Sequence, residues 1–309
     1  MTEVLRVDEP GVFTTIQDLG RPQAVGSGVP PGGAMDRFAH LAANLLLFND
    51  AAAPTLECTL RGPRLVAEAA CVVAVTGGDL QPRVNEAFIP MWTSITLAPG
   101  DTLSFGGRRL GARAYVAVSG GFVGDRWLGS MSTNVMAGRG GMHGRALAAG
   151  DVLTAGESWR PAQPGRTLAE DLRPAYGERS LRVIPGPHVD RLAPESRAAL
   201  FGSPFTLGTD SNRMGYRLDG PLLEAPGEEL LSFGLIAGVV QLPSGGRPIL
   251  LMADHQTAGG YPLVAVVASA WLPVAAQLAP GDELRFVETP IDEALRGRAA
   301  QRAALDSIS

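Results

Sequence analysis

Glycine and proline interrupt this chain so often that little room is left for long regular elements. The 309 residues include 39 glycines and 24 prolines, about a fifth of the sequence. Both residue types favour turns and weaken the interiors of helices and strands. The sequence therefore predicts a mainly β protein of short strands and tight turns, with a few short helices.

Short runs rich in apolar and β-branched residues, bounded by turn residues, mark the expected strands. These strands cover residues 55–60, 71–76, 94–97, 102–105, 113–118, 181–184, 238–242, 248–252 and 283–287. A helix is expected over residues 36–48, because Asp36 is a good N-cap and apolar residues follow it at helical spacing. His40 in this helix is expected at the surface or half-buried. Further helices are expected over residues 192–200 and after Pro290, the latter with Leu295 facing inward.

Three short motifs recur in the same order in the two halves of the chain. They begin at residues 31 and 185, at residues 61 and 219, and at residues 97 and 278. A duplicated domain explains this order, and chance recurrence of common turn sequences is the alternative. We therefore expect two domains, 1–165 and 166–309, joined by the polar, proline- and glycine-containing stretch 157–178.

The charged residues exclude several kinds of function. All 26 basic residues are arginines, and 31 acidic residues leave a net charge of −5. Without lysine there is no Schiff-base lysine, no P-loop lysine and no site for covalently attached biotin on this chain. Mild acidity without a basic run also argues against nucleic acid as a partner.

The remaining composition favours an ordinary cytoplasmic protein. Cys58 and Cys71 lie in apolar stretches and are expected as buried, reduced thiols. The N-terminus has no apolar signal region, and glycines and prolines interrupt the longest uncharged stretch, so no membrane span is expected. The four histidines are scattered, so no metal site is expected.

Polar residues in glycine-rich settings mark four candidate segments. In the most informative of these, an expected strand runs directly into Asp254 and His255, then Gln256 and Thr257. Asp254 or His255 could act as acid or base near neutral pH. The alternative is a solvated turn whose side chains cap their own backbone.

The other three segments are less specific. Arg213, with Asn212, could hold a carboxylate in its planar guanidinium fork, or could form a surface salt bridge. Gly32 and Gly33 precede a helix and could offer backbone N–H groups to an anion. The third segment contains three polar residues that could form a site or merely fix a loop: Gln17, Asp18 and Arg21.

Taken together, these segments resemble one family, the biotin-dependent carboxyltransferases, which include the KipA-like proteins, allophanate hydrolase subunit 2 and the C subunit of 5-oxoprolinase. The resemblance spans residues 11 to 286. It rests on the stretches GVFTTIQDLGRP, GGAMDRFAHLAANLLLFND, TLECTLRGP, VIPGPHVDRL, GTDSNRMGYRLDGP, GVVQLPSGGRPILLMADHQTAGGYP and QLAPGDELRF.

The resemblance implies two tandem cyclophilin-like β-barrel domains and a role in a multi-subunit enzyme. The implied activity is ATP-dependent 5-oxoprolinase, with ATP and Mg²⁺ used by the complex, which opens the lactam of 5-oxoproline to L-glutamate. The implied partners are the KipI-like and the LamB/YcsF-type subunits of 5-oxoprolinase. The alternatives are carboxyl transfer to urea or another small amide, with carboxybiotin supplied by another protein, and regulation of a KipI-like kinase inhibitor.

For the lactam-opening reaction we expect roles for residues in all four segments. Asp254 or His255 would handle a proton and Tyr261 would donate a hydrogen bond. The substrate would be bound by Asn212, Arg213, Gln256 and Thr257, with Gln17, Asp18 and Arg21 on an opposite wall. The backbone at Gly32, Gly33, Gly259 and Gly260 would bind anionic groups. Because the chain has no nucleotide-binding motif, we expect little activity from it alone.

Overall fold

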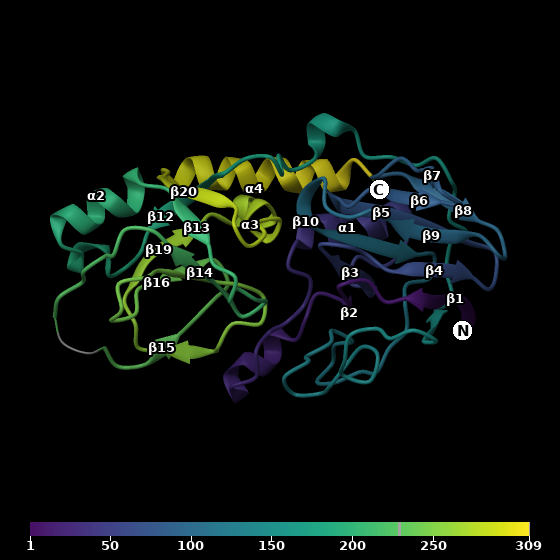
Figure 1. Ribbon diagram of the computed structural model, residues 1–309, viewed down its shortest axis with the longest axis horizontal. Coiled ribbons are helices and arrows are strands. Elements are labelled where there is room, and N and C mark those ends of the chain that lie inside the picture. Colours follow the sequence, from purple (N-terminus) through teal and green to yellow (C-terminus); the bar gives the residue numbers. More distant parts are fainter. Residues whose placement is uncertain (228–229, 309) are drawn as a thin grey trace. The chain divides into compact units, whose positions relative to one another are not determined.

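The computed structural model describes residues 1–227 and 230–308 (Figure 1). Two compact groups of residues can be distinguished. Unit 1 combines residues 1–21 and 32–176 with the C-terminal segment from Gln301, and unit 2 combines residues 22–31 with residues 177–300. These units are defined by contacts between residues and do not test domain boundaries. The division into domains 1–165 and 166–309 therefore stays a prediction.

Unit 1 consists of two antiparallel sheets and a helix. The first sheet has the strand order β11 (Val152–Ala155), β1 (Thr2–Glu9), β4 (Arg64–Ala67), β9 (Thr102–Phe105), β6 (Pro82–Val84) and β7 (Ala87–Phe88). The second has the order β2 (Phe13–Gln17), β3 (Thr55–Thr59), β10 (Leu110–Val118), β5 (Cys71–Asp79) and β8 (Ser94–Leu97). Apolar side chains from both sheets share one core.

Strand β10 is buried on both faces, which explains its nearly continuous apolar sequence. Ala114, Val116 and Val118 belong to the core that the two sheets share. Tyr115 and Ala117 point the other way and pack in the core that includes α1 (Arg37–Leu46). Because side chains alternate along a strand, β10 is the layer common to both cores.

Helix α1 begins where the sequence predicts. The Asp36 carboxylate caps it by accepting the Ala39 N–H at 2.9 Å. His40, however, is completely buried, with Nδ1 2.9 Å from the Thr55 hydroxyl, so the expectation of a surface or half-buried residue was wrong. His40 lies on a face of α1 that packs against the buried strand β3, so solvent does not reach its side chain.

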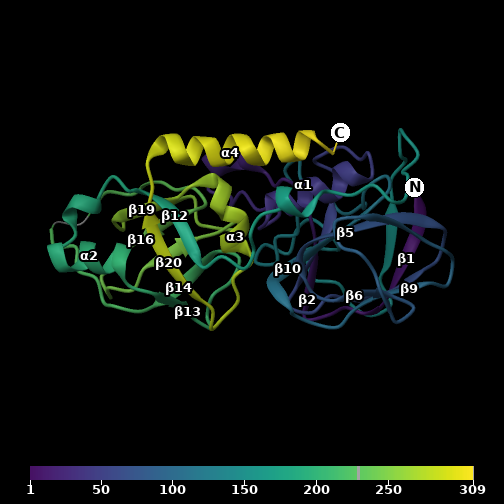
Figure 2. The same ribbon diagram turned by 90° about the horizontal axis from the view of Figure 1, so that it is seen from above.

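Unit 2 contains a closed barrel (Figure 2). Around it the strands follow the order β12 (Ser180–Pro185), β19 (Leu263–Val267), β16 (Val239–Gln241), β17 (Ile249–Leu251), β14 (Gly215–Asp219), β13 (Phe205–Leu207) and β20 (Glu283–Glu288). The parallel pairing of β12 with β20 closes the barrel. A separate pair is formed by β15 (Phe233–Gly234) and β18 (Ala258–Gly259). Unit 2 also contains the helices α2 (Pro194–Gly202) and α3 (Leu272–Ala276) and the 3-10 turns η1 (Pro22–Ser27), η3 (Val189–Arg191) and η4 (Ser269–Trp271), whereas the 3-10 turn η2 (Glu170–Leu172) belongs to unit 1. Helix α4 (Ile291–Asp306) has its residues up to Ala300 in unit 2 and the rest in unit 1.

The mainly β class with few helices is confirmed, and each expected strand overlaps an observed one. The expected pair of tandem barrels is not confirmed, because the strands of unit 1 form two sheets and a closed barrel is found in unit 2. Leu295 was placed wrongly: it is 54% exposed, whereas Ala294 beside it is buried. Cys58 and Cys71 are buried free thiols, as expected.

The recurring Ala-Pro-Gly-Asp motif forms the same turn in both units. Asp101 accepts the Ala98 N–H at 2.7 Å, and Asp282 accepts the Ala279 N–H at 2.9 Å. The backbones of Gly100 and Asp101 are hydrogen-bonded to Ala67. In the same way, the backbones of Gly281 and Asp282 are hydrogen-bonded to Leu207. Asp151 makes the same turn a third time, with the Ala148 N–H at 2.7 Å, so the turn occurs independently of the repeat.

No helix among the described residues combines the length and the hydropathy that crossing a membrane requires.

The buried His40 should make the fold sensitive to acid. Burial lowers the pKa of His40 from 6.5 to about 4. The unfolded chain therefore takes up a proton near pH 6.5 and the native protein only near pH 4, so stability falls as the pH drops through this window. The contribution lost is about 3 kcal/mol.

Urea unfolding of the His40→Gln variant between pH 7 and pH 4 tests this expectation. The variant should lose less stability on acidification than the wild type, whereas His143→Gln, at an exposed histidine, should behave like the wild type. Parallel pH curves for wild type and His40→Gln would contradict the assignment.

Candidate active site

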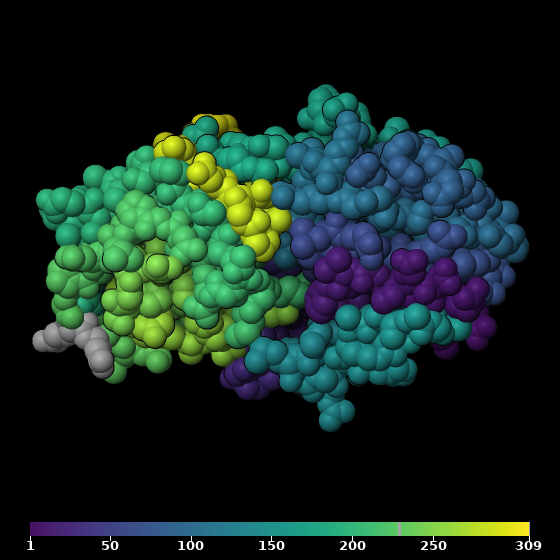
Figure 3. All heavy atoms as spheres, viewed as in Figure 1, coloured from purple at the N-terminus to yellow at the C-terminus, as the bar shows by residue number. Residues whose placement is uncertain are grey.

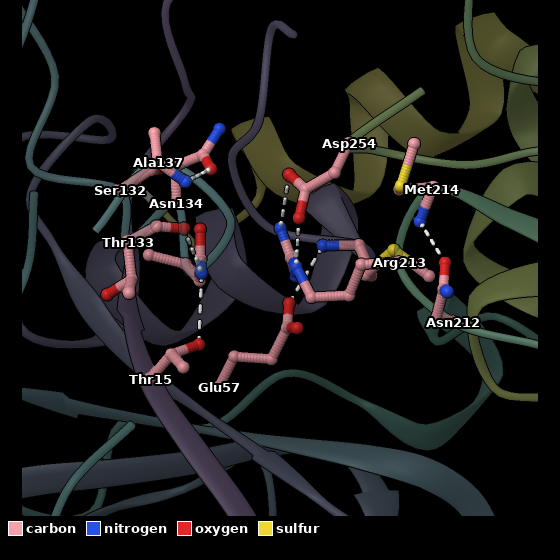
Figure 4. A network of polar contacts seen from close by, with 12 residues as sticks. Thr15, Glu57, Ser132, Thr133, Asn134, Ala137, Asn212, Arg213, Met214 and Asp254 are labelled. Carbon is pink, nitrogen blue, oxygen red and sulfur yellow. Dashed lines mark hydrogen bonds and ion pairs between the residues drawn. The ribbon is translucent and has the colours of Figure 1, made fainter. Parts of the chain in front are cut away.

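The segment after β17 is tied to the segment before β14 by both backbone and side chains. The Asp254 N–H donates to the Arg213 carbonyl at 2.8 Å. The Arg213 guanidinium meets the Asp254 carboxylate in a bidentate pair, with Nε 2.8 Å from Oδ2 and Nη2 3.2 Å from Oδ1 (Figure 4). The side chains are only 11% and 18% exposed. The sequence analysis expected these residues to act on substrate, and the structure pairs them with each other.

His255 is buried beside this ion pair in a defined orientation. Its Nδ1 lies 2.7 Å from the Gln256 carbonyl oxygen, so Nδ1 carries the proton and donates it. Burial lowers the pKa of His255, and the Gln256 carbonyl and the Asp254 charge oppose this effect. The ring is therefore neutral at pH 7 and its Nε2 lone pair can accept a proton.

The neighbouring candidates have structural roles as well. The Asn212 carboxamide oxygen accepts the Met214 N–H at 2.8 Å, which closes the turn that presents Arg213 (Figure 4). The Gln256 amide donates to Gln241 Oε1 at 3.0 Å, and the Thr257 carbonyl accepts the Leu235 N–H at 3.0 Å. Thus the side chains of Asn212 and Gln256 stabilise the segments that carry Arg213 and Asp254.

Tyr261 and the two glycines before it lie further along the chain. Gly259 belongs to β18, and a side chain there would meet Gln241 and Leu235 at 3.1 Å. Gly260 and Tyr261 line a separate hollow in unit 2, and Tyr261 is 47% exposed. No described contact joins Tyr261 to Asp254 or His255.

In unit 1, Asp18 is the centre of a dense hydrogen-bond cluster. Its Oδ1 accepts the hydroxyls of Ser130 and Ser132, both at 2.6 Å, and the Gly20 N–H at 2.7 Å. Its Oδ2 accepts the Met131 N–H at 2.6 Å. This buried carboxylate therefore fixes the loop over residues 130–132, which is the structural alternative that the sequence left open.

Gln17 and Arg21 are held by the same loop. Gln17 Nε2 donates to Thr15 at 2.9 Å and to the Thr133 carbonyl at 3.3 Å. The Arg21 guanidinium donates to the Ser132 carbonyl and lies 4.8 Å from the centre of the Trp127 ring. Both side chains are completely buried. The structure thus brings Gln17, Asp18 and Arg21 together around one loop.

The backbone after Gly32 and Gly33 is committed to internal bonds. The N–H groups of Ala34 and Met35 donate to the Asp18 carbonyl at 2.9 Å and to Glu57 Oε2 at 2.8 Å. Gly33 has a φ of +91°, and a side chain there would lie 2.8 Å from the Leu19 backbone. The glycine is therefore required for the close approach of two loops.

Glu57 is a polar residue that the sequence analysis did not select. It lies on β3, is almost fully buried, and accepts the Tyr115 hydroxyl at 2.7 Å as well as the Met35 N–H. Arg113 lies 4.0 Å away. The signal was a glutamate flanked by apolar residues inside an expected strand, a position that requires hydrogen-bond partners if it is buried.

The positions and chemistry of these residues can now be compared with known proteins. Residues 27–288 match the family model described as carboxyltransferase domain, subdomain A and B. The chain belongs to this carboxyltransferase family.

Relatives of this carboxyltransferase-family protein carry two kinds of name. The chain is 38% identical to the C subunit of 5-oxoprolinase from Escherichia coli K12, over 99% of this chain and 98% of that protein. It is 31% identical to the urea amidolyase of Lachancea kluyveri, over 98% of this chain but 18% of that protein. The crystal structure of the K. lactis urea amidolyase superposes with a TM-score of 0.92 at 30% identity, covering all of this chain and 20% of that one.

The Arg213–Asp254 pair should contribute measurably to the stability of this carboxyltransferase-family protein. Arg213→Ala leaves a mostly buried carboxylate without its bidentate partner, and we expect a loss of about 2 kcal/mol in the free energy of unfolding. The exposed pair of Arg217 and Asp210, also at 2.8 Å, is a matched control, for which we expect at most about 1 kcal/mol. Double-mutant cycles in urea measure both. Equal coupling energies would show that burial does not strengthen the first pair.

Proposed function

We propose that this chain is the C subunit of an ATP-dependent 5-oxoprolinase, which opens the lactam of 5-oxoproline to L-glutamate. The observation that carries the proposal is the 38% identity to a protein named as that subunit, over nearly the full length of both chains. In the proposed complex the partners are the KipI-like and the LamB/YcsF-type subunits of 5-oxoprolinase, all cytoplasmic.

Opening a lactam needs an activated carbonyl and a controlled proton. An amide is a poor electrophile, and ATP with Mg²⁺ supplies activation by phosphorylating the amide oxygen at the level of the complex. The protein must orient the substrate and accept or return a proton at the reacting atoms. Without lysine, arginine side chains and backbone N–H groups must meet the negative charges.

We assign the proton transfer to His255. Its imidazole is neutral, and the Gln256 carbonyl fixes the Nδ1–H tautomer, so Nε2 is the basic atom. The Asp254 carboxylate is engaged by Arg213 through two hydrogen bonds, so its role in this proposal is to hold the guanidinium in place beside the imidazole. In this proposal Arg213, which meets the Asp254 carboxylate in a bidentate pair, also contacts the substrate carboxylate. In this proposal Asn212, Gln256 and Thr257 support that contact and Tyr261 donates a hydrogen bond.

The second candidate function is carboxyl transfer to urea or another small amide. Its support is the similarity to urea amidolyases over 98% of this chain. The chain has no lysine, so carboxybiotin would have to be carried by another protein. The proton acceptor in the site would be the same.

We also propose that the two units descend from one duplicated cyclophilin-like barrel. The support is the series of motifs that recur in the same order in the two halves of the chain.

Reconstitution tests the proposed activity. The chain would be combined with its KipI-like and LamB/YcsF-type partners, ATP, Mg²⁺ and 5-oxoproline, and glutamate measured with each protein omitted in turn. We expect glutamate from the full set and none without this chain. A folded complete complex that yields no glutamate, but consumes carboxybiotin with urea, would favour carboxyl transfer.

Replacing His255 tests its assignment within the active complex. His255→Gln should lower kcat by about 10²- to 10⁴-fold with little change in KM. The wild-type rate should fall on the acid side below the ordinary histidine pKa, because burial lowers the pKa of His255. His188→Gln, at the second histidine of unit 2, which is half-buried, is the control. An unchanged kcat in His255→Gln would remove the assignment.

A further inference from the structure

A buried glutamine ends one of the apolar strands of the barrel in unit 2. Gln241 is the last residue of β16, follows Val239 and Val240, and is 1% exposed. Its pairing partners on the neighbouring strands are Ile249 on β17 and Leu263 on β19. Burying an amide side chain is costly unless its polar atoms find hydrogen-bond partners. Apolar packing alone therefore does not explain a glutamine at this position.

The strand pairing is irregular at the same place. Along β19, Ala265 lies opposite Val240 and Leu263 lies opposite Gln241, so Val264 is left over between them. The pairing of β16 with β17 keeps a regular register here. A β-bulge re-aims side chains, and bulges are over-represented next to active sites. The bulge therefore sets the position of Gln241 apart from the regular ladder of the barrel.

Two consecutive hydrogen bonds join Gln241 to His255 through Gln256. Gln241 Oε1 accepts the Gln256 side-chain N–H at 3.0 Å. The Gln256 backbone carbonyl accepts from His255 Nδ1 at 2.7 Å. Gln241 thus holds the residue whose carbonyl selects the tautomer of the imidazole. Because β16 is a strand of the closed barrel, it offers the segment of His255 a fixed point of attachment.

The contact between the two amides is tightly enclosed, and one donor in it stays unpaired. A side chain at Gly259 would lie 3.1 Å from Gln241 Nε2 and 3.7 Å from Gln256 Nε2. Gln241 Nε2 is buried and has no hydrogen-bond partner within residues 1–227 and 230–308. An unpaired buried donor lowers the stability of a fold, and such exceptions are expected at functional sites. Gln241 therefore fits a role in the site better than a role in stability.

We propose that Gln241 is a positioning residue for His255. It holds the Gln256 amide, keeps the Gln256 carbonyl against the Nδ1–H group, and so leaves the Nε2 lone pair free for the proton transfer. The inference deepens the proposed function and rests on it for what His255 does. It does not rest on it for how the ring is held, because the tautomer of His255 can be measured on the full chain alone.

Histidine side-chain NMR of the full chain, with and without Gln241→Met, tests how the ring is held. Methionine is also an unbranched side chain but lacks the carbonyl oxygen that accepts from Gln256. We expect the Nδ1–H tautomer of His255 in the wild type and a mixture of both tautomers in the variant. The pKa of His255 should be lower in the variant, because the bond to the Gln256 carbonyl opposes the effect of burial in the wild type.

The variant should keep the fold. Gln241→Met removes an unpaired buried donor together with the hydrogen bond, and Gln256 is only half-buried, so its released amide can bind water. Figure 3 shows the light-green chain of this region at the surface of unit 2. We therefore expect little change in the thermal unfolding midpoint. Gln256→Met breaks the same bond from the other side, so it should change the His255 signals in the same way and decides the question if Gln241→Met does not fold. Gln277→Met, at a completely buried glutamine after α3, is the matched control and should leave these signals unchanged.

The reconstituted complex tests whether the orientation matters for turnover. Gln241→Met should lower kcat by about 10- to 100-fold with little change in KM, since a small misplacement of a reacting group is enough for such a loss. Gln277→Met should turn over like the wild type.

The outcomes separate the positioning role from the proposed function. An unchanged tautomer and pKa of His255 in both variants would overturn the positioning role and leave the 5-oxoprolinase proposal standing. A changed tautomer with an unchanged kcat would overturn the positioning role and the assignment of His255 together. A complete wild-type complex that yields no glutamate would overturn the proposed function and the catalytic part of the inference, even where NMR of the chain alone shows that Gln241 orients the ring.

Discussion

The buried carboxylate of Asp18 is the contact on which much of unit 1 depends. It accepts hydrogen bonds from Gly20, Ser130, Met131 and Ser132, so it joins the end of β2 to a loop more than a hundred residues away in sequence. The Asp18 carbonyl then accepts the Ala34 N–H just before α1. A charge removed from water must be compensated by such donors, which is why the surrounding loops have one defined conformation.

The same requirement organises the second buried carboxylate of unit 1. Glu57 accepts the Tyr115 hydroxyl and the Met35 N–H, and the Asp36 carboxylate next to Met35 accepts the Tyr176 hydroxyl. These bonds fix the start of α1 against the sheet, while apolar burial of the helix supplies the packing. Polar residues therefore determine where the elements meet, and apolar residues determine which faces are covered.

Much of the fold could be predicted because its signals are local. Asp36 marked the start of α1, and short β-branched runs marked the strands, since both depend on neighbours within a few residues. The burial of His40 and the exposure of Leu295 depend on which other elements cover each helix face, and a single sequence does not contain that information. Among the candidate residues, the sequence placed Arg213 and Asp254 in two separate glycine-rich segments. It could not show that the two side chains pair with each other. Glu57 was missed because its partners, Tyr115 and Met35, come from distant segments.

The closed barrel of unit 2 has a consequence for how other chains can attach to it. In unit 1, β7 is the last strand of its sheet and pairs with β6 on one side only among the described residues, and an extended peptide could pair with such an edge. A closed ring of strands has already paired its backbone groups on both sides. A protein that recognises this barrel must therefore read its side chains and loops, so evolution can change its choice of partner by surface substitutions without touching the hydrogen-bond ladder that holds the barrel together.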